Sequence, residues 1–474
     1  MNNIAIIDKN TKCSYIQLYK YIQKTIAFLK DLKIKENDKI ILFDDNSIEV
    51  VILIFALNKI GAIFTILNTR TNNKKFQYIF NDIKSSTIFI SHNYYKEKKE
   101  LIKQNFISIF INDSLLDNIQ KYNIKTDKIE KTFFQFPNND KIATIIYTSG
   151  STGFPKGVIV LNKNINFSMK EIQKRLEYQS NDKILCGLDF SFDYGLYQIF
   201  LTFNVGATLI IKENYNNLLD VPTLLYKYQI TIFPVVPTII DTLLISRLLE
   251  RVKLNSLRMI TSTGDVLTIS TIKKIKKILP NVLIIPMYGI TECKRVAIMP
   301  KDMLEKKIGS VGKVLDNVKI YLKSNGELVV EGENVTAGYL NDKNSSNQST
   351  YFEIKNNKKI LHTGDYFKID NDGYLYFIGR KDDLVKINSK RISLKEIERD
   401  LKDTFLTINE ISIIFREKLF IFIYGEIDKN KISKFIKTNF FIDRIEVYII
   451  KKSLPKNNNG KIDKNELFKQ YLSW

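Results

Sequence analysis

The chain has 474 residues, which at the usual ~150 residues per domain predicts about three domains or lobes. Its composition, with 44% hydrophobic and 26% charged residues, is typical of a folded protein and excludes a wholly disordered or collagen-like chain. The 72 basic and 51 acidic residues give a net charge of +21, which favours phosphate-bearing or acidic partners. A non-enzymatic nucleic-acid-binding protein is therefore one alternative. However, the bias toward Lys in all segments explains the charge as well, and we find no basic-aromatic stripe or known binding motif.

Cysteine and histidine are scarce, which excludes several kinds of site. The odd number and uneven spacing of the three cysteines predict neither a disulfide framework nor a zinc site, and fit a reducing compartment. Two histidines leave no Ser-His-Asp hydrolase of ordinary spacing and no His-based metal centre. The N-terminus lacks a basic segment followed by an apolar core, and the longest apolar run, 50–57, is shorter than the ~20 residues of a membrane span. We therefore expect a cytoplasmic protein without a membrane partner.

Helix and strand signals alternate from residue 15 onward. Residues 15–32 predict a helix, 38–45 a strand, 49–61 a buried helix and 62–67 a strand. Further short apolar runs predict strands at 85–91, 141–149, 207–212, 230–236, 257–265 and 281–289. This alternation predicts an α/β protein with helices on both faces of a sheet.

The pattern changes after about residue 315. Polar and apolar residues alternate at 319–332 and 372–387, which predicts antiparallel hairpins, and the tail from about 381 is short and Lys-rich. We find no internal repeat and no long low-complexity linker. The domain boundary is therefore expected at a tight joint near 379–383, between an N-terminal domain of residues 1–379 and a C-terminal domain of residues 380–474.

One segment carries the strongest chemical signal. In IATIIYTSGSTGFPKG (142–157) a predicted buried strand enters a loop rich in small, hydroxyl and cationic residues, namely Thr148, Ser149, Gly150, Ser151, Thr152, Gly153, Lys156 and Gly157. Glycines let the backbone approach an anion closely, and successive N–H groups and hydroxyls then coordinate phosphate oxygens. The spacing differs from the Walker pattern G-x-x-x-x-G-K-[ST]. We interpret the segment as a phosphate-binding loop.

This loop resembles the signature of the adenylate-forming superfamily, which includes acyl-CoA synthetases, peptide-synthetase adenylation domains and luciferases. Further motifs of that family follow in the expected order: MYGITE (287–292), GELVVEGENVTAGYL (326–340), HTGD (362–365), GRKDDLVKI (379–387) and LPKNNNGKID (454–463). The resemblance covers nearly the whole chain. It implies a large N-terminal domain of α/β subdomains plus a β-rich subdomain, followed by a small mobile α+β C-terminal lid.

The resemblance also implies an AMP-forming acid-thiol ligase that uses ATP and Mg²⁺. Lys461 matches the family lysine that contacts both the carboxylate and the α-phosphate, where a cation neutralises two anions brought together. Glu292 supplies a hard oxygen ligand suited to Mg²⁺, and Thr148 is a second candidate ligand. A binding-only relative that senses an adenylate would be expected to lose Lys461 or Glu292, and both are present.

Further positions match nucleotide-binding residues of the family. Asp365 and Arg380 match the residues that hold the ribose hydroxyls, and Tyr288 matches the aromatic residue that stacks on adenine. Gly289 and Thr291 belong to the same motif as Tyr288. These positions complete the predicted ATP site.

The resemblance assigns a hinge and also shows a departure. Asp382 matches the residue about which the lid rotates between adenylation and thioester formation. Relatives usually carry a Gly in the loop that lines the thiol tunnel, whereas this chain has Ser389. The C-terminal portion also lacks a clear LPxYMxP segment. These differences concern thiol transfer rather than adenylation.

The acceptor pocket of the family lies near segments 187–200 and 261–267, the second of which contains Gly264. Many acyl-CoA synthetases have a His in the first segment, whereas this chain has Asp193, as do relatives that bind the α-ammonium of an amino acid. An anionic group in a partly buried pocket needs a cation, which a substrate ammonium supplies. The alternative is that Asp193 caps a helix beginning at Tyr194. Arg295 is a further candidate for this pocket.

We therefore predict amino-acid activation for a separate acyl or peptidyl carrier protein. An acyl-CoA ligase that uses free coenzyme A is the alternative. We expect a stand-alone ligase, since no carrier or condensation domain motif occurs in the sequence. Carrier proteins of this kind are typically acidic, so a net charge of +21 favours their docking by electrostatic steering. No nucleic acid is predicted as a partner.

Overall fold

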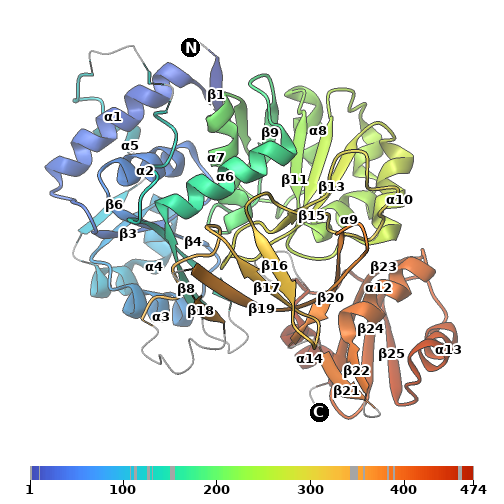
Figure 1. The fold of residues 1–474 in the computed structure, drawn as a ribbon. Helices are drawn as coiled ribbons and strands as arrows, with labels where there is room; N and C mark the ends of the chain where they lie inside the picture. The colour runs from blue at the N-terminus through green and yellow to red at the C-terminus, as the bar shows by residue number, and fades with distance from the viewer. Residues whose placement is uncertain are drawn as a thin grey trace.

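The computed structural model describes residues 3–9, 11–106, 108–111, 115–124, 129–130, 132–149, 155–341, 351–355, 358–381, 384–387, 390–456 and 462–472. Figure 1 shows a large body, coloured from blue through yellow to orange-brown, and a smaller C-terminal part in orange-red.

Two sheets form the framework of the body. Within the described residues, one sheet has the strand order β15-β14-β13-β12-β11-β9-β10-β1-β2, and the other has the order β6-β5-β3-β4-β7-β8. The first comprises β15 (Lys313–Val314), β14 (Ala297–Ile298), β13 (Leu283–Tyr288), β12 (Met259–Ser262), β11 (Ile232–Val235), β9 (Lys183–Cys186), β10 (Thr208–Ile211), β1 (Ile4–Asp8) and β2 (Thr11–Ser14). The second comprises β6 (Ser108–Ile111), β5 (Thr87–Ile90), β3 (Lys39–Phe43), β4 (Ile63–Leu67), β7 (Ile142–Ser149) and β8 (Pro155–Leu161). The strands from β9 to β13 pair in parallel, so their carboxyl ends share one edge of the sheet.

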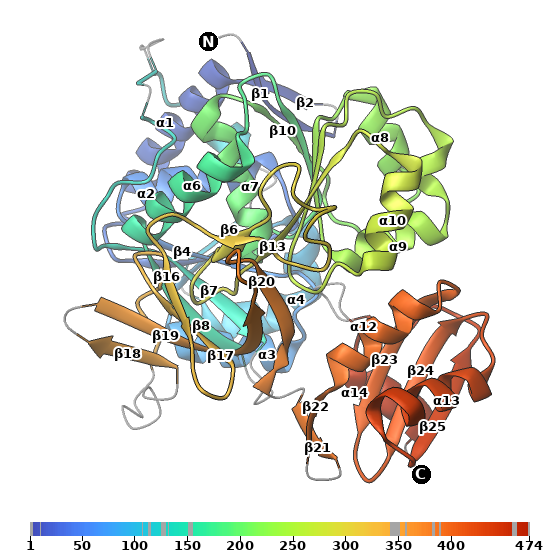
Figure 2. The same ribbon diagram turned by 45° about the vertical axis from the view of Figure 1, so that its right-hand side comes forward.

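Helices pack on and between these sheets. They are α1 (Tyr15–Asp31), α2 (Ile48–Lys59), α3 (Asn73–Ile83), α4 (His92–Asn105), α5 (Leu115–Asn118), α6 (Asn162–Leu176), α7 (Asp193–Val205), α8 (Val221–Lys227), α9 (Pro237–Ile245) and α10 (Ile269–Ile278). Helix α2 is buried from Val50 to Asn58, as expected of a helix that is apolar all round. It packs on β4, whereas α7 packs on β9 and β10, and α6 contacts both β8 and α7. Figure 2 shows these three helices between the strands of the two sheets.

A smaller antiparallel sheet follows in the chain. Its strands are β16 (Lys319–Leu322), β17 (Glu327–Glu331), β18 (Phe352–Lys355), β19 (Lys358–Ile369) and β20 (Leu375–Arg380). Strand β19 pairs with β17, β18 and β20. The alternating pattern at 319–332 therefore forms the expected hairpin of β16 and β17.

The C-terminal part contains a hairpin, a three-stranded sheet and three helices among its described residues. These elements are β21 (Leu384–Ile387), β22 (Lys390–Ser393), α12 (Leu394–Thr404), β23 (Ile408–Phe415), β24 (Leu419–Gly425), α13 (Lys429–Phe440), β25 (Ile445–Ile450) and α14 (Lys464–Leu472). Its buried apolar side chains, from Leu394 to Leu467, form clusters separate from those of the body. We call residues 394–472 the lid.

The predicted fold class is confirmed: an α/β body with a β-rich portion precedes a small α+β unit. Each strand predicted from an apolar run is present, with ends that differ from the prediction by at most three residues. The boundary between residues 379 and 380 stays a prediction, and it falls between the last buried residue of the body core, Leu375, and the first of the lid core, Leu394.

Candidate active site

The predicted phosphate-binding loop connects β7 and β8. These strands pair antiparallel, and the register sets Thr148 opposite Lys156. Both side chains are half-buried. Gly157 is tightly packed here, because a Cβ atom would lie 3.0 Å from the Tyr147 ring and from Ile145 Cγ2. The loop residues Gly150, Ser151, Thr152 and Gly153, and the side chain of Ser149, lie outside the described residues.

Lys156 faces the segment that contains Tyr339 and Leu340. Its Nζ lies 5.1 Å from the centroid of the Tyr339 ring and 5.4 Å from that of Tyr351. The segment is fixed to β8 by backbone hydrogen bonds, among them one from Leu340 N to Gly157 O at 2.7 Å. The predicted motif at 326–340 therefore lies beside the phosphate-binding hairpin.

Glu292 lies beside Tyr339, the residue whose ring Lys156 faces. The Tyr339 hydroxyl donates a hydrogen bond to Glu292 Oε1 at 2.8 Å, and Thr336 N donates to the Glu292 carbonyl at 2.9 Å. Burial raises the pKa of Tyr339, and the Glu292 carboxylate raises it further, so the hydroxyl keeps its proton and remains a donor. Tyr339 thus joins Lys156 and Glu292, two residues that the sequence separates widely.

The residues predicted to bind adenine and ribose also lie together. Tyr288, the last residue of β13, donates from its hydroxyl to Asp365 Oδ2 at 2.7 Å. Arg380 Nε lies 2.9 Å from Asp365 Oδ1. The Tyr288 ring is buried and meets Phe367 edge to face, with the centroids 4.6 Å apart. The Tyr288 side chain is therefore held in place by Asp365 at its hydroxyl and by Phe367 at its ring.

Gly289 and Thr291 have structural reasons for their identity. A Cβ atom on Gly289 would lie 1.8 Å from the carbonyl oxygen of Lys294, so only glycine fits the turn that follows β13. Thr291 is buried. This turn carries Glu292 back toward Tyr339.

Asp193, Gly264 and Arg295 surround the carboxyl ends of β11 and β12. Asp193 is the first residue of α7 and is buried, but Phe192 is the N-cap residue and no side chain caps the helix. The alternative that Asp193 caps a helix is therefore not supported. Gly264 follows β12 with φ +94°, and a Cβ atom there would contact Val236 and Phe192. Arg295 reaches the same strand end, because its Nη1 donates to Thr263 Oγ1 at 2.9 Å.

Sequence reasoning missed two residues of this site, Tyr339 and Lys294. Tyr339 lies within a motif that we recognised, but nothing in the motif indicated its bond to Glu292. Lys294 is 1% exposed and lies between Glu292 and Arg295 in the chain. Burial lowers its pKa to about 8, although the carboxylates of Asp193 and Glu292 oppose this shift. In so basic a chain, no sequence signal distinguishes this lysine from the exposed ones.

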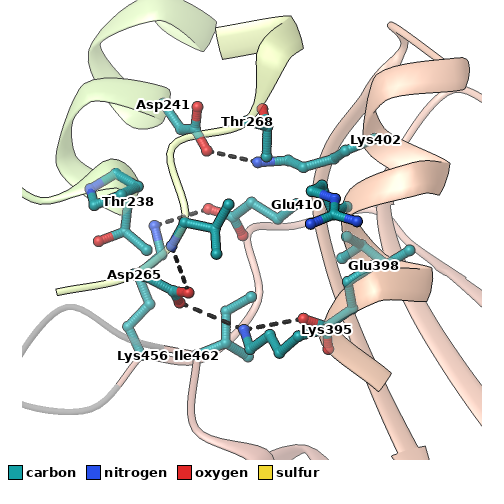
Figure 3. A pocket seen from close by; sticks show the side chains of 14 residues that line it. Thr238, Asp241, Asp265, Thr268, Lys395, Glu398, Lys402, Glu410, Lys456 and Ile462 are labelled. Carbon is teal, nitrogen blue, oxygen red and sulfur yellow. Dashed lines mark hydrogen bonds and ion pairs between the residues drawn. The ribbon is translucent and has the colours of Figure 1, made fainter. Parts of the chain in front are cut away.

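The lid contacts the body close to Gly264, a residue predicted to line the substrate pocket. Figure 3 shows this interface, in which Lys402 Nζ lies 2.6 Å from Asp241 Oδ2 and Lys395 Nζ lies 3.4 Å from Asp265 Oδ2. Lys456 Nζ lies 2.7 Å from Glu410 Oε1 and donates to Thr242 Oγ1 at 3.2 Å.

The loop that bears Lys461 starts and ends at this interface. Lys456 and Ile462 form a β-bridge and line a cavity of about 80 Å³ together with Thr238 and Asp265. Asp265 directly follows Gly264 of the acceptor pocket. Lys461 itself, Asp382 and Ser389 lie outside the described residues.

Two kinds of feature are absent from the described residues. Among the described residues, no helix combines the length and apolar character needed to cross a membrane. The same part of the chain contains no cluster of three or more His, Cys, Asp or Glu side chains arranged to hold a metal.

Comparison with known proteins identifies relatives of two kinds. The AMP-binding enzyme family matches residues 1–340. Gramicidin S synthase 2 from Brevibacillus brevis is 24% identical over 98% of this chain and 11% of its own length, so the chain spans about a tenth of that relative. The 2-succinylbenzoate–CoA ligase from Bacillus licheniformis is 28% identical over 84% of this chain and 80% of its own length.

Solved structures share the fold of this chain. The structure of VinN with L-aspartate is 25% identical, with a TM-score of 0.69 over 80% of this chain and 95% of that chain. O-succinylbenzoate coenzyme A synthetase from Bacillus subtilis, in complex with ATP and magnesium ion, is 22% identical, with a TM-score of 0.81 over 98% of this chain and 96% of that chain.

Proposed function

Since this chain belongs to the AMP-binding enzyme family, a family of AMP-forming ligases, we propose that it activates a carboxylic acid with ATP and then joins the acyl group to a thiol. In the first step a carboxylate oxygen attacks the α-phosphorus of ATP, an acyl adenylate forms and pyrophosphate leaves. In the second step a thiolate attacks the adenylate carbonyl, a thioester forms and AMP leaves. The favoured substrate is an amino acid, and the favoured acceptor is the phosphopantetheine thiol of a separate carrier protein. Free coenzyme A is the alternative acceptor.

The body residues supply nucleotide contacts in this scheme. Lys156 and the hairpin around Thr148 bind the phosphates, while Asp365 accepts hydrogen bonds from the ribose hydroxyls and Arg380 helps to hold them. Tyr288 forms the wall beside adenine. The support is that Tyr288 and Arg380 both contact Asp365, and that the strand register sets Thr148 opposite Lys156.

Glu292 and Thr148 fit a magnesium ion in their donor chemistry. Mg²⁺ prefers carboxylate and other oxygen ligands and usually combines one or two of them with substrate phosphates. Glu292 is half-buried and oriented by Tyr339, and Thr148 lies opposite Lys156, which packs on the same Tyr339. The ion, when bound, neutralises phosphate charge. The hydrogen bond from Tyr339 fixes the orientation of the Glu292 carboxylate that would bind the ion.

Lys461 is assigned to neutralise charge as the carboxylate approaches the α-phosphate. The support comes from the two ends of its loop. Lys456 and Ile462 are held against the body beside Asp265, one residue from Gly264. Rotation about Asp382 would then withdraw Lys461 for the thiol-transfer step.

The preference for an amino acid rests on one observation, the environment of Asp193. Its carboxylate is buried, caps no helix, and has no cation within 4.0 Å among the described residues. A buried carboxylate is costly without a cation, so a substrate ammonium is the natural partner. One similar structure supports this choice, because the VinN structure contains L-aspartate. The similarity to 2-succinylbenzoate–CoA ligase supports the alternative, an acyl-CoA ligase.

The test is carboxylate-dependent ATP–pyrophosphate exchange with amino acids, their des-amino analogues and short acids. Asp193→Asn keeps the shape of the side chain but removes its charge. We expect a loss of roughly ten- to hundred-fold in kcat/KM for amino acids, the value of one charged hydrogen bond, and little change for des-amino acids. An unchanged ratio between the two substrate classes would leave an acyl ligase as the better account. Transfer assays with coenzyme A and with an acidic carrier protein then distinguish the acceptors.

A further inference from the structure

Two positively charged side chains are buried side by side in the chain near Asp193. Lys294 is 1% exposed and its Nζ has no hydrogen-bond acceptor in the described part of the chain. Arg295 is 5% exposed; its Nη1 bonds to Thr263, but its Nε has no acceptor among the same residues. Burying a charge is costly unless it is paired and hydrogen-bonded. Both side chains therefore retain donors with no internal partner.

Arg295 is held in a definite place. Its guanidinium lies 5.3 Å from the centroid of the Tyr194 ring, and the Tyr194 hydroxyl donates to the Thr261 carbonyl at 2.8 Å. Tyr194 follows Asp193 at the start of α7, and Thr261 and Thr263 lie at the carboxyl end of β12. In α/β sheets, ligands bind at the carboxyl ends of the strands. The arginine thus belongs to the pocket predicted for the carboxylic acid that is activated.

The hydrogen bond to Thr263 leaves one edge of the guanidinium available. Only Nη1 is engaged, so the edge formed by Nε and Nη2 makes no hydrogen bond to a described residue. Two parallel N–H groups on one edge match the two oxygens of a carboxylate. The donor geometry therefore selects a planar anion rather than a neutral group.

The balance of charges in the site also indicates that an anion binds there. The cluster contains two carboxylates, Asp193 and Glu292, and two cations, Lys294 and Arg295. No carboxylate of the described residues lies within 4.0 Å of either cation. If Glu292 binds Mg²⁺ and Asp193 binds an ammonium, both cations remain without an anion. The reacting carboxylate cannot fill this role throughout, because it loses its charge when the adenylate forms.

We infer that Arg295, assisted by Lys294, binds a second carboxylate on the side chain of the substrate, so that the enzyme activates a dicarboxylic amino acid. This inference rests on the proposed function. It adds two specificity-determining contacts: the ammonium pairs with Asp193, and the side-chain carboxylate pairs with the free edge of Arg295.

The first experiment uses the wild-type enzyme. ATP–pyrophosphate exchange is measured with L-aspartate and L-glutamate and with their neutral amides, L-asparagine and L-glutamine. We expect at least one of the acidic substrates to exceed its amide by roughly ten-fold or more in kcat/KM, since the amide replaces a charged hydrogen bond by a neutral one. Preference for amides or apolar amino acids would overturn the inference and leave the proposed function intact. Absence of exchange with every carboxylic acid would overturn the proposed function itself.

The second experiment uses matched variants. Arg295→Gln is expected to lower the ratio of acidic to amide activity by roughly ten- to hundred-fold, with a smaller effect on the amide substrate. Arg258→Gln is the control, because Arg258 pairs with Asp182 at the opposite end of β12 and should leave the ratio unchanged. An unchanged ratio in Arg295→Gln would overturn the inference. If that variant fails to fold, Lys294→Met provides the same comparison, and an unchanged ratio in it would remove the contribution of Lys294.

Discussion

Replacing Lys294 with Met should make the protein more stable and less active. Burial lowers the pKa of Lys294 from 10.5 to about 8, and a fall of this size corresponds to about 3 kcal/mol favouring the neutral amine over the charged one in the folded state. Methionine has a similar length and carries no charge. The residue has φ +58°, a conformation that strains both side chains alike. We therefore expect the free energy of unfolding at pH 7 to rise by up to about 3 kcal/mol.

The assay is urea unfolding in metal-free buffer, with Lys319→Met as a control on an exposed strand residue. The control should change stability by less than about 0.5 kcal/mol. The pH dependence provides a second measurement. Between about pH 8 and 10.5 the folded wild type releases the proton of Lys294 while the unfolded chain keeps it, so wild-type stability rises and the advantage of the variant disappears. A variant that is less stable at pH 7, by an amount independent of pH, would refute the reasoning.

Three further predictions concern catalysis. Lys461→Ala should lower adenylation by roughly a hundred-fold or more, as loss of one transition-state stabiliser does, while transfer from a preformed adenylate should suffer less; near-normal pyrophosphate exchange would remove this assignment. Asp382→Pro fixes φ near −65° at the predicted hinge and should slow one half-reaction far more than the other, and equal wild-type rates in both would show that the pivot lies elsewhere. Tyr339→Phe removes the 2.8 Å hydrogen bond to Glu292 and should raise the Mg²⁺ concentration needed for half-maximal exchange by roughly ten-fold. The exposed Tyr321, changed to Phe, is its control, and an identical Mg²⁺ dependence in both variants would contradict the positioning role of Tyr339.

The sequence was most informative where the local structure depends on a single segment. An apolar run such as 283–288 forms a buried strand whichever segments flank it. The ordered motifs place Thr148 near the end of β7, Glu292 in the turn after β13 and Asp365 within β19. Contacts between segments were not predictable in this way. The bond from Tyr339 to Glu292 depends on how a late loop returns to β8, and the burial of Lys294 depends on packing around α7.

Asp193 illustrates the same limit. A helix-capping role and a ligand-binding role give the same sequence pattern, because Asp is common at both kinds of position. The two roles differ only in where the helix begins. The structure places Phe192 at the N-cap position, one residue earlier than the alternative requires.

The contact between the lid and the body has a consequence for how readily the two parts can separate. The lid contributes Lys395 and Lys402, which pair with the carboxylates of Asp265 and Asp241 of the body, whereas Lys456 pairs with Glu410 of the lid itself. Such an interface separates without exposing a large apolar surface, and each ion regains water as it leaves. The apolar cores of lid and body are separate, so the rotation proposed for the lid would disrupt neither core. At a physiological ionic strength the Debye length is about 8 Å, but partly buried ion pairs are screened much less than exposed ones. The side chains of Lys402 and Asp241 are each only 15% exposed, so dissolved salt would shift the proposed equilibrium between lid orientations only weakly.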